Sequence, residues 1–106
     1  MKYRYMRMLL FFDLPVGTAT QRREYRQFRR HLIKSGFIML QESVYCKLVP
    51  NNTVLLSVKY NIIKNKPSSG DIMLLNVTEK QFSRMEFILG DFQTDVINSD
   101  ERLIIL

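Results

Sequence analysis

A nearly continuous apolar run near the start of the chain, residues 8–12 with Leu14, constrains the fold more than any other feature. A strand with one face in water alternates apolar and polar side chains, and this run does not alternate. We therefore expect a strand that is buried on both faces. Pro15 stops its pairing, and Asp13 places one carboxylate at its end, where many sheet proteins hold catalytic or metal-binding groups. Asp13 is the first candidate functional residue.

The size and the cysteine content of the chain limit its class. A chain of 106 residues predicts one domain, and burial in so small a domain is modest, so a partner subunit would help. Cys46 is the only cysteine, which excludes an intrachain disulfide and suits a reducing cytosol. We expect it to be a small core residue. No segment approaches the roughly 20 apolar residues of a membrane span, so we expect a cytoplasmic protein that does not contact membranes.

The charge of the chain is unevenly distributed. Residues 1–34 carry nine Lys or Arg and two acidic residues, whereas residues 71–106 carry three Lys or Arg and seven acidic residues. The basic end suggests a polyanion as partner. The acidic end could face the basic surface of a protein partner, or it could simply keep the chain soluble.

The first predicted helix covers residues 21–34. Thr18 or Thr20 can cap its start, and Gly36 ends it. Its apolar face is formed by residues at helical spacing, namely Tyr25, Phe28 and Leu32.

The remaining elements are predicted from short apolar runs and turn residues. Residues 37–40 and 44–49 form either a tight hairpin or one long strand bent at a bulge. A second helix follows and ends in the loop at residues 65–70. Beyond it we expect strands at 71–77 and 85–89, a loop at 90–95 and a final apolar run at 103–106.

This order of elements predicts the fold class. Strand, helix, strand, strand, helix, strand is the split β-α-β pattern of a ferredoxin-like α+β domain. We assign residues 1–80 to this domain and residues 81–106 to a C-terminal strand and arm. Right-handed crossovers place both helices on one face of the sheet and leave the other face uncovered. Because the first strand is apolar on both sides, we expect a second copy to pack sheet to sheet in an isologous homodimer.

The first predicted helix carries the candidate nucleic-acid-binding residues. Between residues 22 and 34 it has six basic residues and one acidic residue, and several basic residues stand four positions apart, where like charges repel. An ordinary solvated helix face is the alternative. A polyanion would relieve the repulsion, and the helices of two subunits could follow a duplex backbone without reading its bases. The candidates are Arg22, Arg23, Arg26, Arg30 and Lys34, with Lys2 and Arg4 as weaker ones.

Three segments, taken in this order, resemble the small CRISPR adaptation protein, the Cas2 family. They are the strand end Phe12-Asp13-Leu14-Pro15, the basic helix over residues 22–30, and Gly36-Phe37 followed by Gln41-Glu42-Ser43-Val44-Tyr45. Each segment is weakly specific alone, and their joint order is more specific. The likeness covers most of the first 77 residues and is closest to members found beside effector systems that use one large nuclease.

The resemblance implies a ferredoxin-like homodimer that bridges two dimers of the large CRISPR integrase subunit. That complex holds a short duplex of foreign DNA and inserts it into the CRISPR array as a new spacer. The resemblance also implies a magnesium-dependent endonuclease acting on RNA or duplex DNA, with Asp13 as catalytic residue and metal ligand in each subunit. Arg22 or Arg23 and Tyr45 match family positions as well. The loop at residues 16–20 lacks the charged or serine residues that several nuclease members carry, so the scaffold role is the first expectation.

Two interpretations of Asp13 stay open. It can be a turn residue whose carboxylate accepts hydrogen bonds from backbone amides near Pro15. In a dimer, two-fold symmetry could instead bring both copies of Asp13 to one cleft. In proteins, magnesium is commonly held by one or two carboxylates together with waters and substrate phosphates.

The final apolar run cannot stay exposed without a risk of aggregation. It can form an edge strand of its own subunit, or it can add to the sheet of the other subunit or of the integrase. The resemblance favours the second interpretation, because family members exchange this arm across the dimer. The residues concerned are Leu103, Ile104, Ile105 and Leu106.

Three functions follow as hypotheses. The first is a DNA-binding scaffold of the spacer integrase. The second is a stand-alone magnesium-dependent endoribonuclease of the toxin-like kind. The third is a generic RNA-binding module, since the RRM shares this topology, but no strand carries the RNP1 pattern of glycines and aromatic residues.

Overall fold

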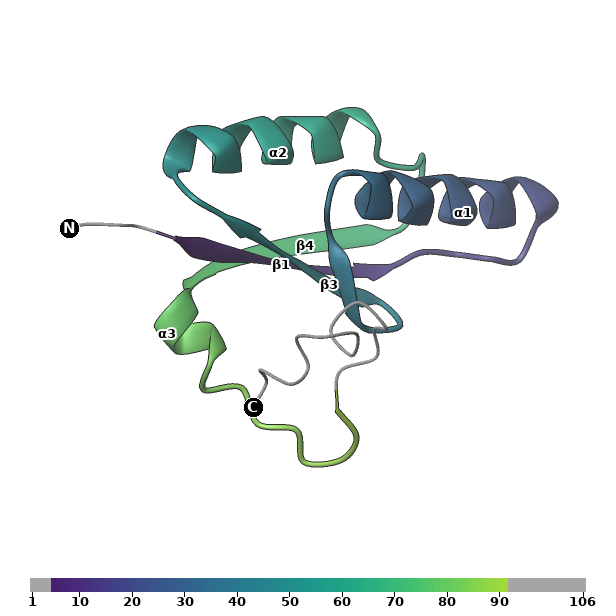
Figure 1. Ribbon diagram of the computed structural model, residues 1–106. Coiled ribbons are helices and arrows are strands. Elements are labelled where there is room, and N and C mark those ends of the chain that lie inside the picture. Colours follow the sequence, from purple (N-terminus) through teal and green to yellow (C-terminus); the bar gives the residue numbers. More distant parts are fainter. Residues whose placement is uncertain (1–4, 92–106) are drawn as a thin grey trace.

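A computed structural model describes residues 5–91 of the chain. An antiparallel sheet with the strand order β2-β3-β1-β4 carries α1 and α2 on one face (Figure 1). This order follows from the split β-α-β pattern, so the predicted ferredoxin-like α+β fold is confirmed. The elements are β1 (Met6–Asp13), α1 (Ala19–Lys34), β2 (Ile38–Gln41), β3 (Val44–Val49), α2 (Asn52–Lys64), β4 (Asp71–Thr78) and α3 (Glu79–Phe82).

β1 lies in the middle of the sheet and is buried on both faces, as its apolar run predicts. Met8 and Leu10 point toward the helices and are fully buried in the main core. On the opposite face, Leu9 packs with Leu40 and Cys46 in a second, smaller cluster. Both faces of β1 therefore contribute to the stability of the domain.

α1 begins at a cap that the sequence identifies. The Thr18 side chain accepts a hydrogen bond from the backbone N–H of Gln21, and the Gln21 side chain accepts one from the Thr18 backbone. This reciprocal capping box satisfies backbone donors that the helix itself leaves free. Phe28 and Leu32 are buried in the core, so the predicted apolar face of α1 is confirmed. Gly36, with φ of 96°, lies just beyond the helix end.

Of the two alternatives for the segment after α1, the tight hairpin is right and the single long strand is wrong. β2 and β3 form a hairpin, and their register shifts between Met39 and Gln41, so the hairpin contains a bulge. α2 follows, capped by the Asn51 side chain, which accepts a hydrogen bond from the backbone N–H of Val54. The second predicted helix is therefore confirmed.

The short helix α3 follows β4 directly and is not predicted by apolar spacing. A second capping box builds it, because the side chains of Thr78 and Gln81 accept hydrogen bonds from each other's backbone. Arg7 of β1 fixes its position. The Arg7 Nε donates to Oε2 of Glu79 at 2.7 Å, and the guanidinium carbon lies 4.4 Å from the centre of the Phe82 ring. We call this set of contacts the Arg7 clasp.

The sheet face opposite α1 and α2 has exposed apolar side chains. The strand register places Leu48, Met73 and Leu75 on the same face as Leu9. Met73 is 66% exposed and Leu75 is 53% exposed. The uncovered face that the topology predicts is therefore present, and we call Leu48, Met73 and Leu75 the open face.

The strand predicted at residues 85–89 is wrong for this chain. No strand is assigned after β4 in the part of the chain that the structure describes. Apolar composition gives these residues strand propensity, but a strand also needs hydrogen bonds from a neighbour, and no described segment provides them. Ile88 and Leu89 are instead almost fully exposed.

Within residues 5–91, no helix is both long enough and apolar enough to cross a membrane.

Some predictions concern residues outside the described range. These residues are Lys2, Arg4, Leu103, Ile104, Ile105 and Leu106.

Candidate nucleic-acid interface

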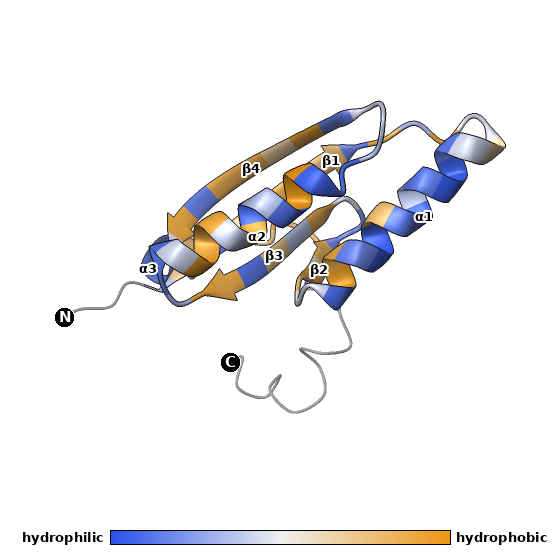
Figure 2. Cartoon of the chain, turned by 90° about the horizontal axis from the view of Figure 1, so that it is seen from above, coloured by the Kyte–Doolittle hydropathy of each residue, from blue (hydrophilic) through white to orange (hydrophobic). Residues whose placement is uncertain are grey.

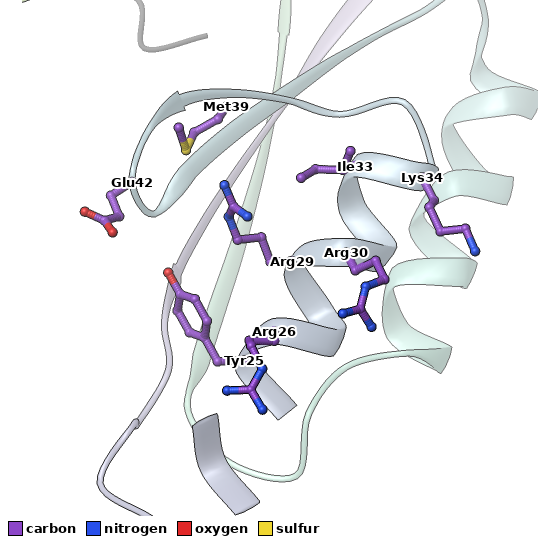
Figure 3. Close-up of a pocket in the computed structure, with 8 residues that line it drawn as sticks. All are labelled: Tyr25, Arg26, Arg29, Arg30, Ile33, Lys34, Met39 and Glu42. Atoms are coloured by element: carbon purple, nitrogen blue, oxygen red, sulfur yellow. The ribbon is translucent and has the colours of Figure 1, made fainter. Parts of the chain in front are cut away.

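All five basic residues predicted on α1 are exposed. Arg26, Arg30 and Lys34 also share a cavity of about 680 Å³ between α1 and the β2–β3 hairpin (Figure 3). Arg29 and Glu42 line the same cavity, which we call the basic groove. The fold thus gathers three of the predicted residues on one side of the helix.

Arg22 and Arg23 lie nearer the start of α1 and do not line the basic groove. The Arg22 Nη1 donates to the carbonyl oxygen of Val16 at 3.1 Å, which directs this side chain toward the loop between β1 and α1. Both side chains stay exposed, so their charges add to the positive field of the helix.

Arg29 is a candidate that sequence reasoning missed. Its Nε donates to the hydroxyl of Tyr45 at 2.8 Å. In Figure 3 its side chain reaches from α1 toward the hairpin. Arg29 lies three residues after Arg26, on the same side of α1, and this spacing is the signal that could have found it. Its anchoring by Tyr45 depends on how β3 packs against α1, which the sequence alone does not give.

Tyr45 is a core residue that holds Arg29. Its side chain is fully buried, and its ring stacks on Phe12 with 5.7 Å between ring centres. Burial raises the pKa of the Tyr45 phenol, and the neighbouring Arg29 guanidinium opposes this effect only in part. The hydroxyl therefore stays neutral and serves as a fixed acceptor for Arg29.

The acidic residue of α1 is held on the other side of the helix. Oε1 of Glu24 accepts hydrogen bonds from Oγ of Ser68 at 2.9 Å and from its backbone N–H at 3.3 Å. Ser68 lies in the loop between α2 and β4, in a cavity lined by other residues of α1 than the basic groove. Glu42 is thus the acidic residue that faces the four basic residues of the groove. This separation of charges leaves the groove strongly positive.

Asp13 is exposed at the end of β1 and stands directly opposite Asp71, the first residue of β4. Directly opposed residues of antiparallel strands point to the same face, with Cβ atoms about 4.5–5.5 Å apart. The two carboxylates therefore stand side by side at one end of the sheet, and like charges in this arrangement destabilise it. A cation bound between them would remove this cost.

Gly70 fits closely against the end of β1. Its φ is 108°, which favours glycine. A Cβ atom added there would come 3.0 Å from the carbonyl oxygen of Asp13 and 2.7 Å from Cδ2 of Leu14. The conformation of this turn therefore fixes how Asp71 enters the sheet beside Asp13.

The side chains that could bind a magnesium ion provide only some of the ligands that the ion needs. Within residues 5–91, no group of three or more His, Cys, Asp or Glu side chains could hold a metal ion. Asp13 and Asp71 give one subunit two neighbouring carboxylates. Because magnesium is often bound by one or two carboxylates together with waters and substrate phosphates, this pair suits a site that nucleic acid completes.

Comparison with known proteins adds to this geometry. The model of a family described as CRISPR associated protein Cas2 matches residues 6–85. The chain belongs to the Cas2 family. The matched range contains both the basic groove and the Asp13–Asp71 pair, so both features lie in the Cas2 part of the chain.

Several Cas2 relatives resemble the chain over nearly all of its length. One from Treponema denticola is 54% identical over 95% of this chain and 100% of the relative. One from Streptococcus mutans strain UA159 is 48% identical, with 95% of this chain and 93% of the relative covered. One from Ligilactobacillus salivarius is 46% identical, with 95% of this chain and 100% of the relative covered. Each of these relatives is named CRISPR-associated endoribonuclease Cas2.

Proposed function

We propose that the chain acts in CRISPR adaptation as a homodimeric scaffold that binds duplex prespacer DNA. The observation that carries this proposal is the basic groove, in which four basic residues meet one acidic residue. A surface so strongly of one sign attracts a polyanion. Arg26, Arg30 and Lys34 project from a single helix and can contact successive phosphates of a backbone. Such contacts position a duplex without reading its sequence.

The dimer is supported by the open face. Met73 and Leu75 expose much of their apolar surface to water on the side of the sheet away from α1 and α2. Packing two open faces sheet to sheet would bury these side chains, which is favourable by about 25 cal/mol per Å² of apolar surface. Two-fold symmetry then supplies two basic grooves for one duplex.

The integrase role is supported by membership of the Cas2 family and by the resemblance of the strand end and basic helix. We propose that the dimer bridges two dimers of the large CRISPR integrase subunit. The final apolar run, which includes Leu103 and Leu106, would add as a strand to the other subunit or to the integrase.

Salt-dependent DNA binding tests the basic groove. Wild type and Arg30→Gln are titrated with a short DNA duplex at several salt concentrations, with Lys80→Gln on α3 as a control. Each lost phosphate contact should reduce the slope of log affinity against log salt by about one. We expect this reduction for Arg30→Gln and no change for Lys80→Gln. Equal slopes for all three proteins would reject the groove as the binding surface.

Spacer integration tests the scaffold role directly. The large integrase subunit, a short duplex and an array fragment are mixed with wild type, with Asp13→Ala or with neither. We expect integration to need this protein and to survive Asp13→Ala. Loss of integration with intact DNA binding would give Asp13 a direct role, and integration that does not need this protein would reject the scaffold.

A metal-dependent endoribonuclease is the second candidate function. The Asp13–Asp71 pair favours it, and the relatives are named endoribonucleases. Magnesium held by this pair would polarise a phosphoryl oxygen and lower the pKa of a water. Asp13 and Asp71 would hold the ion, and the arginines of α1 would hold the flanking backbone.

An RNA-cleavage assay tests this second candidate function. Purified wild type, Asp13→Asn and Asp71→Asn are incubated with single-stranded RNA in magnesium and again with a chelator. The nuclease hypothesis predicts cleavage by wild type that both substitutions and the chelator abolish. Cleavage that persists in Asp13→Asn would point to a contaminating nuclease.

A further inference from the structure

α2 carries a row of apolar side chains that faces away from the core. Leu56, Tyr60 and Ile63 are 53%, 61% and 52% exposed. They stand four and three residues apart, so they lie along one side of the helix, while Leu55 and Ile62 are buried beneath it. Figure 2 looks down on this helix and shows apolar segments among the polar ones on its outer side. We call Leu56, Tyr60 and Ile63 the α2 stripe.

The α2 stripe continues into a cavity between α2 and β4. Ile63 belongs to both, and the other apolar residues of the cavity are Leu10, Ile62, Ile72 and Leu74. The cavity has a volume of about 320 Å³, at the lower end of the range of small binding sites. A cavity of this size suits one or a few protruding apolar side chains.

The borders of the α2 stripe are positively charged. Residues 52–64 include no Asp or Glu. At 100° per residue, Lys59 lies on one flank of the stripe and Lys64 on the other. Lys59 and Lys66 also line the cavity, and Nζ of Lys64 lies 5.4 Å from the centre of the Tyr60 ring. Exposed apolar side chains in one row with a rim of charges are typical of a protein-binding surface.

We propose that the α2 stripe and its cavity bind an acidic amphipathic helix of a partner protein. A helix that docks on another protein binds through its own apolar residues, which stand three or four positions apart. The lysines beside the α2 stripe favour a partner helix that carries acidic residues next to those apolar residues. A second copy of the chain fits poorly, because pairing two stripes would bring Lys59 and Lys64 of both copies together. A nucleic acid backbone would satisfy the lysines and leave Leu56 and Ile63 exposed.

This surface is independent of the proposed DNA scaffold. The open face lies on the opposite side of the sheet, and the basic groove lies between α1 and the hairpin. The α2 stripe can therefore be occupied while a dimer holds a duplex.

A designed helix tests the proposal with the full chain. The probe is a labelled synthetic peptide with leucines three and four residues apart and glutamates at the other positions, compared with a scrambled peptide of the same composition. Fluorescence anisotropy measures binding. We expect the ordered peptide to bind and the scrambled one not to bind. Tyr60→Ser and Ile63→Ser should weaken binding about tenfold or more, as for residues at the centre of an interface.

Two further variants sharpen the test. Ile33→Ser on α1 is a matched control, because Ile33 is the same residue type as Ile63 and is 49% exposed, against 52% for Ile63. It should leave peptide binding unchanged. Lys59→Glu reverses a charge at an exposed position, and it should weaken binding by a factor that shrinks as salt rises. It also keeps the proposal testable if a serine variant does not fold, which circular dichroism would detect.

Three results would overturn the proposal. In the first, the ordered peptide binds no better than the scrambled one, or Ile33→Ser weakens binding as much as Ile63→Ser. In the second, Tyr60→Ser changes the oligomeric state, which would make the stripe a contact between copies of the chain. In the third, Tyr60→Ser and Ile63→Ser lower duplex DNA affinity as much as Arg30→Gln, which would assign the stripe to nucleic acid.

Discussion

Asp13 and Asp71 stand opposite each other at the end of the sheet where β1 pairs with β4. Asp13 stands out in the sequence because it ends an apolar strand. Asp71 lies far from it in the chain, and only the pairing of β1 with β4 in this register brings the two carboxylates together. The contact between Arg29 and Tyr45 is a second example, since their hydrogen bond depends on how β3 packs against α1. Contacts between residues of different helices and strands therefore could not be predicted from the sequence.

Removing one carboxylate should stabilise the domain in the absence of metal. We expect Asp71→Asn to raise the free energy of unfolding by about 0.2–1 kcal/mol, because it removes a like-charge pair across two strands. The same substitution should reduce the extra stability that magnesium gives. Urea unfolding with and without magnesium measures both effects, and Asp91→Asn, away from this pair, is the control. An unchanged magnesium effect in Asp71→Asn would show that the pair does not bind the ion.

Cys46 should make the domain less stable at alkaline pH. Burial raises the pKa of its thiol, with Arg7 opposing the shift. The ordinary pKa of a thiol is about 8.5, so above it the unfolded chain releases a proton that the folded chain keeps. Stability that is fully present below this pH is then lost as the pH rises toward the folded value. Unfolding under reducing conditions from pH 7 to 10 should show this decline in wild type, and a decline of equal size in Cys46→Ala would contradict it.

At the scale of elements, caps and apolar spacing predict α1, α2 and the core strand well. Each depends on residues close together in sequence, such as Thr18 with Gln21. α3 has the same signal, because Thr78 and Gln81 repeat that capping box, but the helix is too short to show apolar spacing. The strand expected at residues 85–89 fails for the opposite reason. Its residues have strand propensity, but a strand depends on a distant partner, which local sequence does not reveal.

The turn before β4 should tolerate no side chain at Gly70. We expect Gly70→Ala to cost at least about 1–2 kcal/mol, since its φ is positive and the new Cβ would press against Asp13 and Leu14. Thermal or urea unfolding measures the loss. Gly17→Ala is a control without either problem, and Gly90→Ala separates the two causes, because its φ is positive with no atom near the added Cβ. Equal stability of Gly70→Ala and Gly17→Ala would disprove the tight packing of this turn.

At the scale of the whole molecule, the split β-α-β order predicts correctly that both helices share one face and that the other face is left open. It does not predict that the Arg7 clasp brings α3 onto part of that open side. Leu48, Met73 and Leu75 remain exposed, so the open face is still the surface on which the proposed dimer depends.

A charge on the open face should disrupt the proposed dimer. We expect Leu75→Lys to convert a dimer to a monomer, because the lysines of both copies would be buried in the interface without partners. Light scattering after size-exclusion chromatography measures the mass. Leu56→Lys on α2 is the matched control, since both leucines are 53% exposed. A monomeric Leu56→Lys with a dimeric Leu75→Lys would place the contact on the helices instead.

The Arg7 clasp also determines how the molecule would respond to force. α3 is attached to the domain through Glu79 and Phe82, and both contacts end on Arg7 in the central strand. Phe82 also packs against the cluster of Leu9, Leu40 and Cys46. Tension applied to the end of α3 would therefore act on these side-chain contacts before it acts on the hydrogen bonds between β1 and β4. The clasp would break before the ladder between β1 and β4, and α3 could be pulled away from the domain while the sheet and both of its long helices stay intact.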